Sequence, residues 1–245
     1  MGEPRIVDAI VVGGVDFGES DRIVRLLTPG GLIAGFAPAA RKSRKRFGGS
    51  LEPFTTVRAE LSTRRRAGTP LLLSADAIVH RAGLRTELER LAAASYASEL
   101  SAEVAPEGTP SDLYARLGAR LDLWAVEGAS LASRRAFELS VLEELGSGPD
   151  LGPCIDCGVP GMFLDLPRGG LFCRNHRGRG KEIGPHTKAW LEAVLYSGCL
   201  DARGHLSPED ADRAARAVGG SIDAALDPWL DGPLDSKKLL LELGL

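Results

Sequence analysis

Four residues that could bind one metal ion fall in a short stretch of the chain. Cys154 and Cys157 are separated by two residues, and after fifteen further residues Cys173 and His176 repeat the same spacing. Two ligands three positions apart can point from one tight turn at one ion, and Zn²⁺ prefers four nitrogen or sulfur ligands in a tetrahedron. The spacing therefore predicts one structural zinc ion per chain, bound by these four residues.

The sequence determines the fourth ligand less well than the three cysteines. His186 is the alternative to His176, whereas His80 and His205 have no ligand-like neighbours. The remaining cysteine, Cys199, falls on the apolar face of an expected helix, and we expect it to lie in the core.

A structural ion fits this stretch better than a catalytic one. Residues 153–157 match one half of the zinc deaminase signature, but the upstream His-x-Glu half is absent, since His80 is followed by Arg81 and Ala82. Four protein ligands also leave no open position for water. A thioredoxin-like pair is disfavoured because no βαβ pattern surrounds it, and residues 178–181 lack the phosphate-binding loop frame. We therefore expect no enzymatic activity.

The second chemical feature is a run of cations that directly follows an expected strand. Five cations fall within six residues, and an aromatic ring and two glycines come next: Arg41, Lys42, Arg44, Lys45 and Arg46, then Phe47. Phe36 and Phe54 lie close by in the sequence, so the three rings could offer a stacking face for bases. A second cluster follows on the next two strands: Arg58, Arg64, Arg65 and Arg66.

These cations favour binding to nucleic acid. Cations that neutralise phosphates release counterions, so binding of this kind tolerates many sequences and weakens with salt. The alternative is that the run is an ordinary solvated loop. Net charge supports the first interpretation, since residues 1–80 carry +4, residues 81–150 carry −5 and residues 151–245 carry −2.

The elements that must position these residues divide into strands and helices. Five short strands at residues 4–15, 22–28, 32–40, 54–61 and 71–79 predict an OB-fold barrel, with an SH3-like barrel as the alternative. Apolar residues then recur at helical spacing, which predicts helices at 84–100, 111–124, 131–145, 185–200, from Ser207 and from Asp235. We expect an α+β multidomain protein: an OB-fold DNA-binding domain at 1–80 and a helical domain at 81–245, with a zinc finger inserted at 151–180.

Composition limits the class further. The chain has 245 residues, of which 44% are hydrophobic and 26% charged, as in globular proteins. No apolar run reaches the roughly 18 residues that span a bilayer, and no secretory signal opens the chain. Four cysteines in this pattern favour a reducing cytoplasm over a disulfide framework, so we expect a cytoplasmic, nucleoid-associated protein.

Over nearly its whole length the sequence resembles the RecO family of bacterial recombination mediators. The matching segments are Gly18–Val24 with Thr28 and Gly31, the basic run at 40–46, Leu51–Phe54, Tyr96 and Glu99, Phe137 and Glu138, Leu142, Leu145–Gly146, Cys154, Cys157–Gly158, Gly169–Gly170, Cys173 and Asp235–Leu240. The resemblance implies an N-terminal OB-fold, a helical C-terminal domain and an inserted zinc finger. It differs at His176, because members that bind zinc often have cysteine there, and some members lack the ligands altogether.

The resemblance also implies a function and partners. It implies binding of single- and double-stranded DNA, annealing of complementary strands, and work with RecR and RecF to load RecA onto DNA covered by single-strand-binding protein. Members bind the acidic C-terminal tail of that protein through the helical domain, where Arg134 and Arg135 are possible anchors. The alternative from the sequence is an RNA-binding adaptor that combines an OB-fold with a zinc finger; the acidic helical block at 81–150 favours the mediator.

Overall fold

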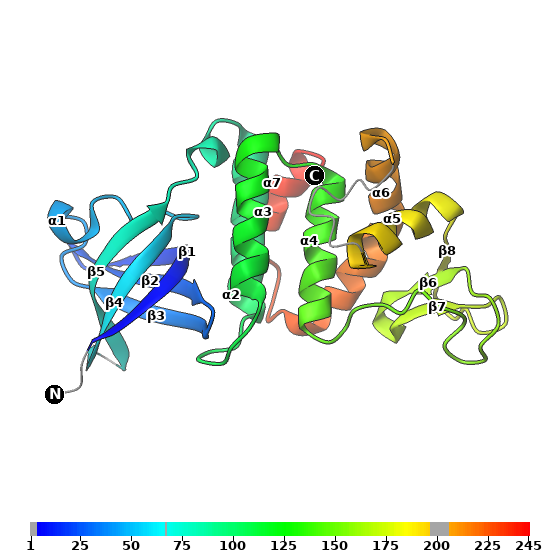
Figure 1. Ribbon diagram of the computed structural model, residues 1–245, viewed down its shortest axis with the longest axis horizontal. Coiled ribbons are helices and arrows are strands. Elements are labelled where there is room, and N and C mark those ends of the chain that lie inside the picture. Colours follow the sequence, from blue (N-terminus) through cyan, green and yellow to red (C-terminus); the bar gives the residue numbers. More distant parts are fainter. Residues whose placement is uncertain (1–3, 67, 197–205) are drawn as a thin grey trace. The chain divides into compact units, whose positions relative to one another are not determined.

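The computed structural model describes residues 4–66, 68–196 and 206–245, which form two compact units, Met1–Val126 and Glu127–Leu245 (Figure 1). Cys199 and His205, about which the sequence made predictions, lie outside the described residues. The boundary between the units falls within the helical block, after the third helix, and not at residue 80. Each unit is described by itself.

The first unit contains the predicted barrel. Five strands close into a barrel in the order β1-β2-β3-β5-β4, with β1 antiparallel to both β2 and β4, and with β3 parallel to β5 at Phe36 and Leu71. A closed five-stranded barrel with this connection is OB-like, so the predicted fold class is confirmed. The elements of this unit are β1 (Arg5–Phe17), β2 (Asp21–Thr28), β3 (Gly31–Ala37), α1 (Arg44–Phe47), β4 (Thr56–Arg66), β5 (Thr69–Val79), η1 (Ala82–Arg85), α2 (Leu88–Val104) and α3 (Leu113–Glu127).

Strand β1 shows why the barrel and two helices form one unit. Four consecutive residues, 9–12, are buried, although alternate side chains of a strand point to opposite faces. Val11 belongs to the apolar core of the barrel, with Val24, Leu72 and others. Ile10 faces the other way and lies close to Gly118 of α3, where an added Cβ would be 3.5 Å from the Ile10 side chain. Both faces of β1 are therefore covered, one by the barrel and one by a helix.

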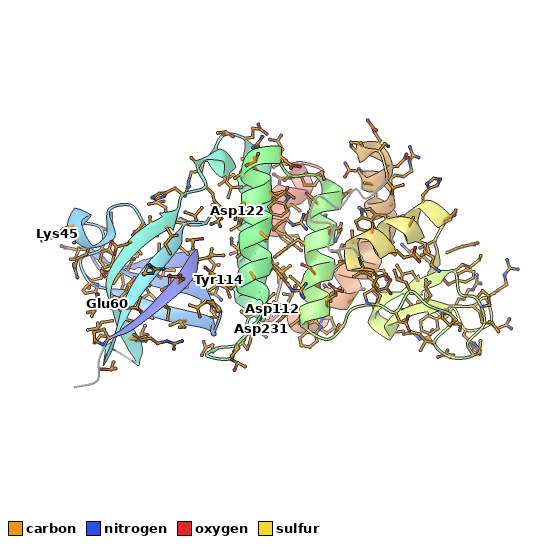
Figure 2. All side chains as sticks on the ribbon, in the orientation of Figure 1. Lys45, Glu60, Asp112, Tyr114, Asp122 and Asp231 are labelled. Carbon is orange, nitrogen blue, oxygen red and sulfur yellow. The ribbon has the colours of Figure 1, made fainter. Side chains whose placement is uncertain are left out.

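Polar contacts also hold the helices to the barrel. Arg81 is 5% exposed and donates from Nε to Asp122 of α3 at 2.7 Å. Its Nη1 donates to the Phe54 carbonyl at 2.7 Å and to the Thr56 hydroxyl at 2.9 Å. One guanidinium thus satisfies acceptors from the barrel and from α3. Figure 2 labels Asp122 and Tyr114 along that helix.

The second unit consists of four helices and a small three-stranded sheet in the order β7-β6-β8 (Figure 1). Helix α6 begins as the sequence predicts, with the Ser207 hydroxyl accepting from the Asp210 N–H at 3.1 Å and Pro208 in the first turn. The elements are α4 (Leu131–Glu144), β6 (Phe163–Asp165), η2 (Leu166–Arg168), β7 (Gly170–Phe172), β8 (Lys181–Glu182), α5 (Pro185–Tyr196), α6 (Pro208–Leu226), η3 (Asp227–Trp229) and α7 (Asp235–Glu242).

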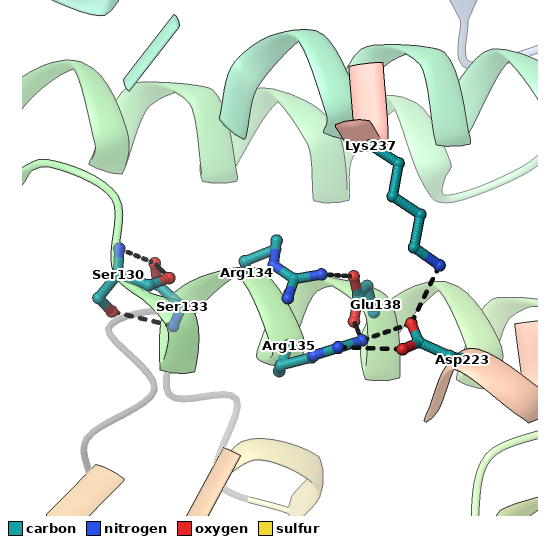
Figure 3. A network of polar contacts seen from close by, with 7 residues as sticks. All are labelled: Ser130, Ser133, Arg134, Arg135, Glu138, Asp223 and Lys237. Atoms are coloured by element: carbon teal, nitrogen blue, oxygen red, sulfur yellow. Dashed lines mark hydrogen bonds and ion pairs between the residues drawn. The ribbon is translucent and has the colours of Figure 1, made fainter. Parts of the chain in front are cut away.

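A buried ion network joins three helices of this unit (Figure 3). Glu138 of α4 is fully buried and accepts from Arg134 at 2.6 Å and from Arg135 at 2.8 Å. Arg135 also contacts both carboxylate oxygens of Asp223 on α6, at 2.7 and 3.2 Å. Lys237 of α7 reaches the same carboxylate at 3.3 Å. Because each buried charge faces an opposite charge, the network removes the penalty of burying it.

A glycine in α6 makes room for this network. An added Cβ at Gly219 would lie 2.9 Å from Nη2 of Arg135 and 3.2 Å from its Cζ. Glycine in a helix costs about 1 kcal/mol relative to alanine. Here the missing side chain lets the Arg135 guanidinium pack against the helix backbone.

We predict that Glu138→Ala destabilises the helical unit by about 3–5 kcal/mol, because it leaves two buried guanidiniums without the carboxylate they share. Urea unfolding, followed through the fluorescence of the buried Trp190, measures the change. Glu242→Ala removes an exposed glutamate at the end of α7 and serves as the control, with an expected change below about 0.5 kcal/mol. Equal stability of the two variants would refute the importance of the network.

Candidate metal centre and nucleic-acid interface

The four predicted metal ligands come together in the second unit. The metal-binding atoms of Cys154, Cys157, Cys173 and His176 all lie within 4.8 Å of one another. The Sγ atoms of Cys157 and Cys173 are 3.8 Å apart, and Nδ1 of His176 lies 3.5 Å from Sγ of Cys173 and 3.7 Å from Sγ of Cys154. His186 is exposed at the start of α5 and is not part of the cluster. The geometry therefore selects His176 of the two histidines.

These distances match a tetrahedral zinc site. With Zn–S bonds of about 2.3 Å and Zn–N bonds of about 2.0 Å, a regular tetrahedron places two sulfurs about 3.8 Å apart and sulfur and nitrogen about 3.5 Å apart. Three sulfurs and one imidazole nitrogen are also a ligand set that zinc prefers. All four corners are protein atoms, so the arrangement fits a structural ion and leaves no position for a substrate.

Two tight turns aim the ligands at one point. In the first turn, the N–H groups of Cys157 and Gly158 donate to the Cys154 carbonyl at 3.3 and 2.8 Å, and Gly158 has a positive φ of 74°. In the second, the N–H of His176 donates to the Cys173 carbonyl at 3.1 Å. Between the turns β6 and β7 pair antiparallel, as the alternation at 163–172 predicts.

Arg168 connects the two turns. Its Nη2 donates to Asp156 in the first turn at 2.9 Å, and its Nη1 donates to the His176 carbonyl in the second at 2.8 Å. The guanidinium lies 3.7 Å from the centre of the Phe172 ring, a cation–π contact. Contacts around a ligand set hold the ligands in place, so Arg168 stabilises the geometry of the cluster.

The electrostatic surroundings favour a thiolate at Cys154. Burial raises the pKa of this thiol, but hydrogen bonds from the Cys173 backbone, from the His176 side chain and from neighbouring backbone groups lower it to about 6. Metals bind cysteine as thiolate. The first ligand is therefore already ionised at neutral pH.

The predicted basic run lies in a segment fastened to one end of the barrel, beside the loop between β1 and β2. The Ala39 N–H donates to the carboxylate of Asp21 at 2.8 Å, and the Arg41 N–H donates to the Ser20 carbonyl at 3.0 Å. Part of the run, Arg44–Phe47, forms the short helix α1 and is not the loop that the sequence suggests. Figure 2 labels Lys45 on this helix.

The described cations of this run have different surroundings. Lys42 and Lys45 are exposed, and Arg41 is exposed but lies 3.7 Å from Asp16. Arg46 turns inward, with Nη2 donating to the Pro38 carbonyl at 2.6 Å and its guanidinium 5.0 Å from the Phe47 ring. The side chains of Arg44, Arg64, Arg65 and Arg66 lie outside the described part of the structure.

The predicted stacking face is wrong for this structure. Phe36, Phe47 and Phe54 are 3–4% exposed. Phe47 belongs to the barrel core, and Phe36 packs edge-on against Phe17 at 5.7 Å. These rings are spent on packing, so Phe47 is a core residue here and does not offer a face to a base.

Two further predicted contacts are modified by nearby carboxylates. Arg58 pairs with Asp8 on the neighbouring strand through two bonds of 2.9 and 3.2 Å, which raises its pKa. The pair leaves Arg58 exposed with its charge largely balanced. Arg134 and Arg135, the possible anchors for an acidic tail, are 1% and 6% exposed inside the network of Figure 3, so they do not form a surface site.

A groove of about 450 Å³ lies beside the basic run. Arg22 and Arg41 line it together with Gly48 and Gly49, whose lack of side chains exposes the backbone. Asp16 lies on the same groove, 3.3 Å from Nε of Arg22. The sequence analysis missed this carboxylate and Asp8; the cross-strand pairing of Asp16 with Arg22 and of Asp8 with Arg58 is the signal that could have found them.

The fold and the cluster define a modular protein: an OB-like barrel that carries a basic segment, a set of helices, and a finger with a complete tetrahedral ligand set. Comparison with known proteins identifies the family. Residues 5–80 match the family model "Recombination protein O N terminal" and residues 85–233 match "Recombination protein O C terminal". The chain belongs to the RecO family of DNA repair proteins.

Curated relatives agree with this assignment. A protein of Anaeromyxobacter sp. (strain K) is 38% identical over 96% of this chain and 95% of its own length. Proteins of Geobacter metallireducens and Myxococcus xanthus are each 35% identical and cover 96% and 97% of both chains. All three are named DNA repair protein RecO. Among the described residues, no helix is both long and apolar enough to cross a membrane.

We predict that the protein, purified without chelator, contains one zinc ion per chain, and that Cys154→Ala and His176→Ala lose zinc to a competing chelator at concentrations about tenfold lower or less. His186→Ala is the matched control and should retain zinc as the wild type does, because His186 lies outside the cluster. Metal analysis by mass spectrometry gives the stoichiometry. A metal-free wild type, or equal zinc loss in both histidine variants, would contradict the ligand assignment.

Proposed function

We propose that this protein is a non-enzymatic recombination mediator that binds single- and double-stranded DNA through its barrel and anneals complementary strands. The observation that carries the proposal is the basic run at 41–46, fastened to one end of an OB-like barrel with Arg41, Lys42 and Lys45 exposed. OB-folds bind oligonucleotides through loops and one strand face. The family relationship favours DNA repair over an RNA-binding adaptor.

The barrel would contact the phosphate backbone more than the bases. The three phenylalanines near the run are buried, so the described surface here offers cations and glycine backbone but not those rings. Contacts of this kind carry little sequence information and depend strongly on salt. Such binding suits a protein that acts on any damaged sequence.

The metal has a structural part in this proposal. When bound, zinc would supply a rigid crosslink between the two turns of the finger. Four protein ligands occupy its coordination sphere, which supports a role outside catalysis. The Cys₃His residues hold the turns, and Arg168 fixes the turns to each other.

The proposed partners follow from family membership. Together with RecR and RecF, the protein would help to load RecA onto single-stranded DNA coated with single-strand-binding protein, and the helical unit would bind the acidic tail of that protein. Since Arg134 and Arg135 are buried, the tail would bind other cations of the unit. This role would place the protein at the nucleoid in the cytoplasm.

We predict that the triple variant Arg41→Glu, Lys42→Glu, Lys45→Glu binds an oligonucleotide at least tenfold more weakly near 0.1 M salt. The slope of log affinity against log salt should fall by about 2, since each single-strand phosphate contact contributes about 0.7. Arg46 is left unchanged because it holds the Pro38 carbonyl. Fluorescence anisotropy over a range of salt concentrations measures both quantities.

The matched control for this variant places the same charge change on the helical unit: Lys188→Glu, Arg213→Glu and Lys238→Glu, on α5, α6 and α7. It should bind as the wild type does. If the barrel variant keeps both the affinity and the salt slope, the basic run is not the binding site.

A second prediction concerns strand annealing. The wild type should accelerate pairing of complementary oligonucleotides that are coated with single-strand-binding protein, and the barrel triple variant should not. Deleting the acidic tail of the coating protein should remove the acceleration but leave annealing of bare strands. A fluorescence-quenching assay follows the pairing, and a wild type that does not accelerate it refutes the annealing role.

A further inference from the structure

The outer edge of the finger carries a second concentration of positive charge. Between residues 166 and 181 the chain has five cations and no acid, whereas the rest of residues 127–245 has eight cations and eighteen acids. All five are exposed: Arg168, Arg174, Arg177, Arg179 and Lys181. We call these five residues the finger patch. A cationic patch on an otherwise acidic unit is a localised attraction for a polyanion.

The finger patch is built on the metal cluster. Arg174 lies between the ligands Cys173 and His176, and Arg177 follows directly. The Arg177 guanidinium is 5.5 Å from the centre of the Phe163 ring, and that of Arg168 is 3.7 Å from the Phe172 ring. Rings that lie under guanidiniums hold them in place, so less side-chain entropy is lost when an anion binds.

A groove runs along the same edge. It has a volume of about 810 Å³ and is lined by Arg168, Arg179 and Lys181 on one side and by residues of α6 on the other. An added Cβ at Gly220 would lie 3.8 Å from Nζ of Lys181, so this lysine reaches across to α6. Gly178, also on the groove, leaves backbone open to close approach.

We propose that the finger patch is a second binding site for a nucleic-acid backbone. Guanidinium groups match phosphate oxygens in geometry and remain charged, and several in a row can follow successive phosphates. The exposed apolar residues of the finger, Ile155, Val159 and Met162, do not line the groove. The groove thus suits a charged strand better than the apolar side chains of a peptide.

This inference rests on the proposed DNA-binding function but places a contact on the other unit. The barrel and the finger patch belong to separate compact units. One chain could then hold two strands at once, which is what annealing requires. The metal would act in this function indirectly, by keeping the patch in shape.

The test compares two doubly substituted full-length proteins. Arg174→Glu with Arg179→Glu changes the finger patch but leaves Arg168 and Arg177 on their rings. Lys188→Glu with Lys238→Glu makes the same charge change on α5 and α7. Each lost single-strand phosphate contact removes about 0.7 of a counterion, which is a factor of about five near 0.1 M salt. The finger variant should therefore bind a long oligo(dT) at least fivefold more weakly, with a salt slope lower by about 1, and the control should not change.

Native mass spectrometry with an oligo(dT) of about ten nucleotides separates the two sites. The wild type should bind two oligonucleotides per chain, and the finger variant and the barrel triple variant should each bind one. All variants should keep one zinc ion, which shows that the finger remains folded.

The outcomes distinguish this inference from the proposed function. If the finger variant still binds two oligonucleotides with wild-type affinity, the patch serves another partner, such as an acidic peptide, and the inference is wrong. If the barrel variant binds none, the finger patch is not an independent site, although the barrel function stands. If the barrel variant binds as the wild type does and the finger variant binds none, the barrel function fails and the finger site stands.

Discussion

Tetrahedral coordination is the constraint on which the outer part of the second unit depends. Strands β6 and β7 have three residues each and β8 has two, and sheets this small are not stable by themselves in water. The Cys₃His cluster closes the two turns around them, and Arg168 links the turns through Asp156 and the His176 carbonyl. Since the cations of the finger patch project from these turns, the same coordination fixes where the positive charge lies.

Positive charge is handled in two ways in this chain. Where function does not need it, a carboxylate balances it: Asp8 pairs with Arg58, and Glu138 is shared by two buried guanidiniums. In the basic run and the finger patch it is exposed. The run is held at the barrel by the Asp21 carboxylate, which accepts from the backbone of Ala39 and so does not balance a lysine or arginine there. The exposed cations are therefore the ones available to phosphates.

The sequence predicted what depends on local spacing. Two Cys-x₂ pairs identified the ligands, glycine and proline marked the turns, and five alternating segments indicated the OB-like barrel. It did not predict what depends on contacts between distant residues. The burial of Phe47 comes from packing with strands far away in sequence, and the choice of His176 over His186 required the positions of the three sulfurs. The finger patch was missed because its cations are interspersed among metal ligands and glycines, so they do not form a run.

Hydrogen exchange with bound oligo(dT) tests the central claim most directly, namely that both the basic run and the finger patch contact a nucleic-acid backbone. Amides that a ligand covers or stabilises exchange more slowly. The account predicts slower exchange at residues 39–49 and 174–181 when single-stranded DNA is bound, and unchanged exchange in α7 (Asp235–Glu242). Protection confined to the helices, with neither segment affected, would contradict it.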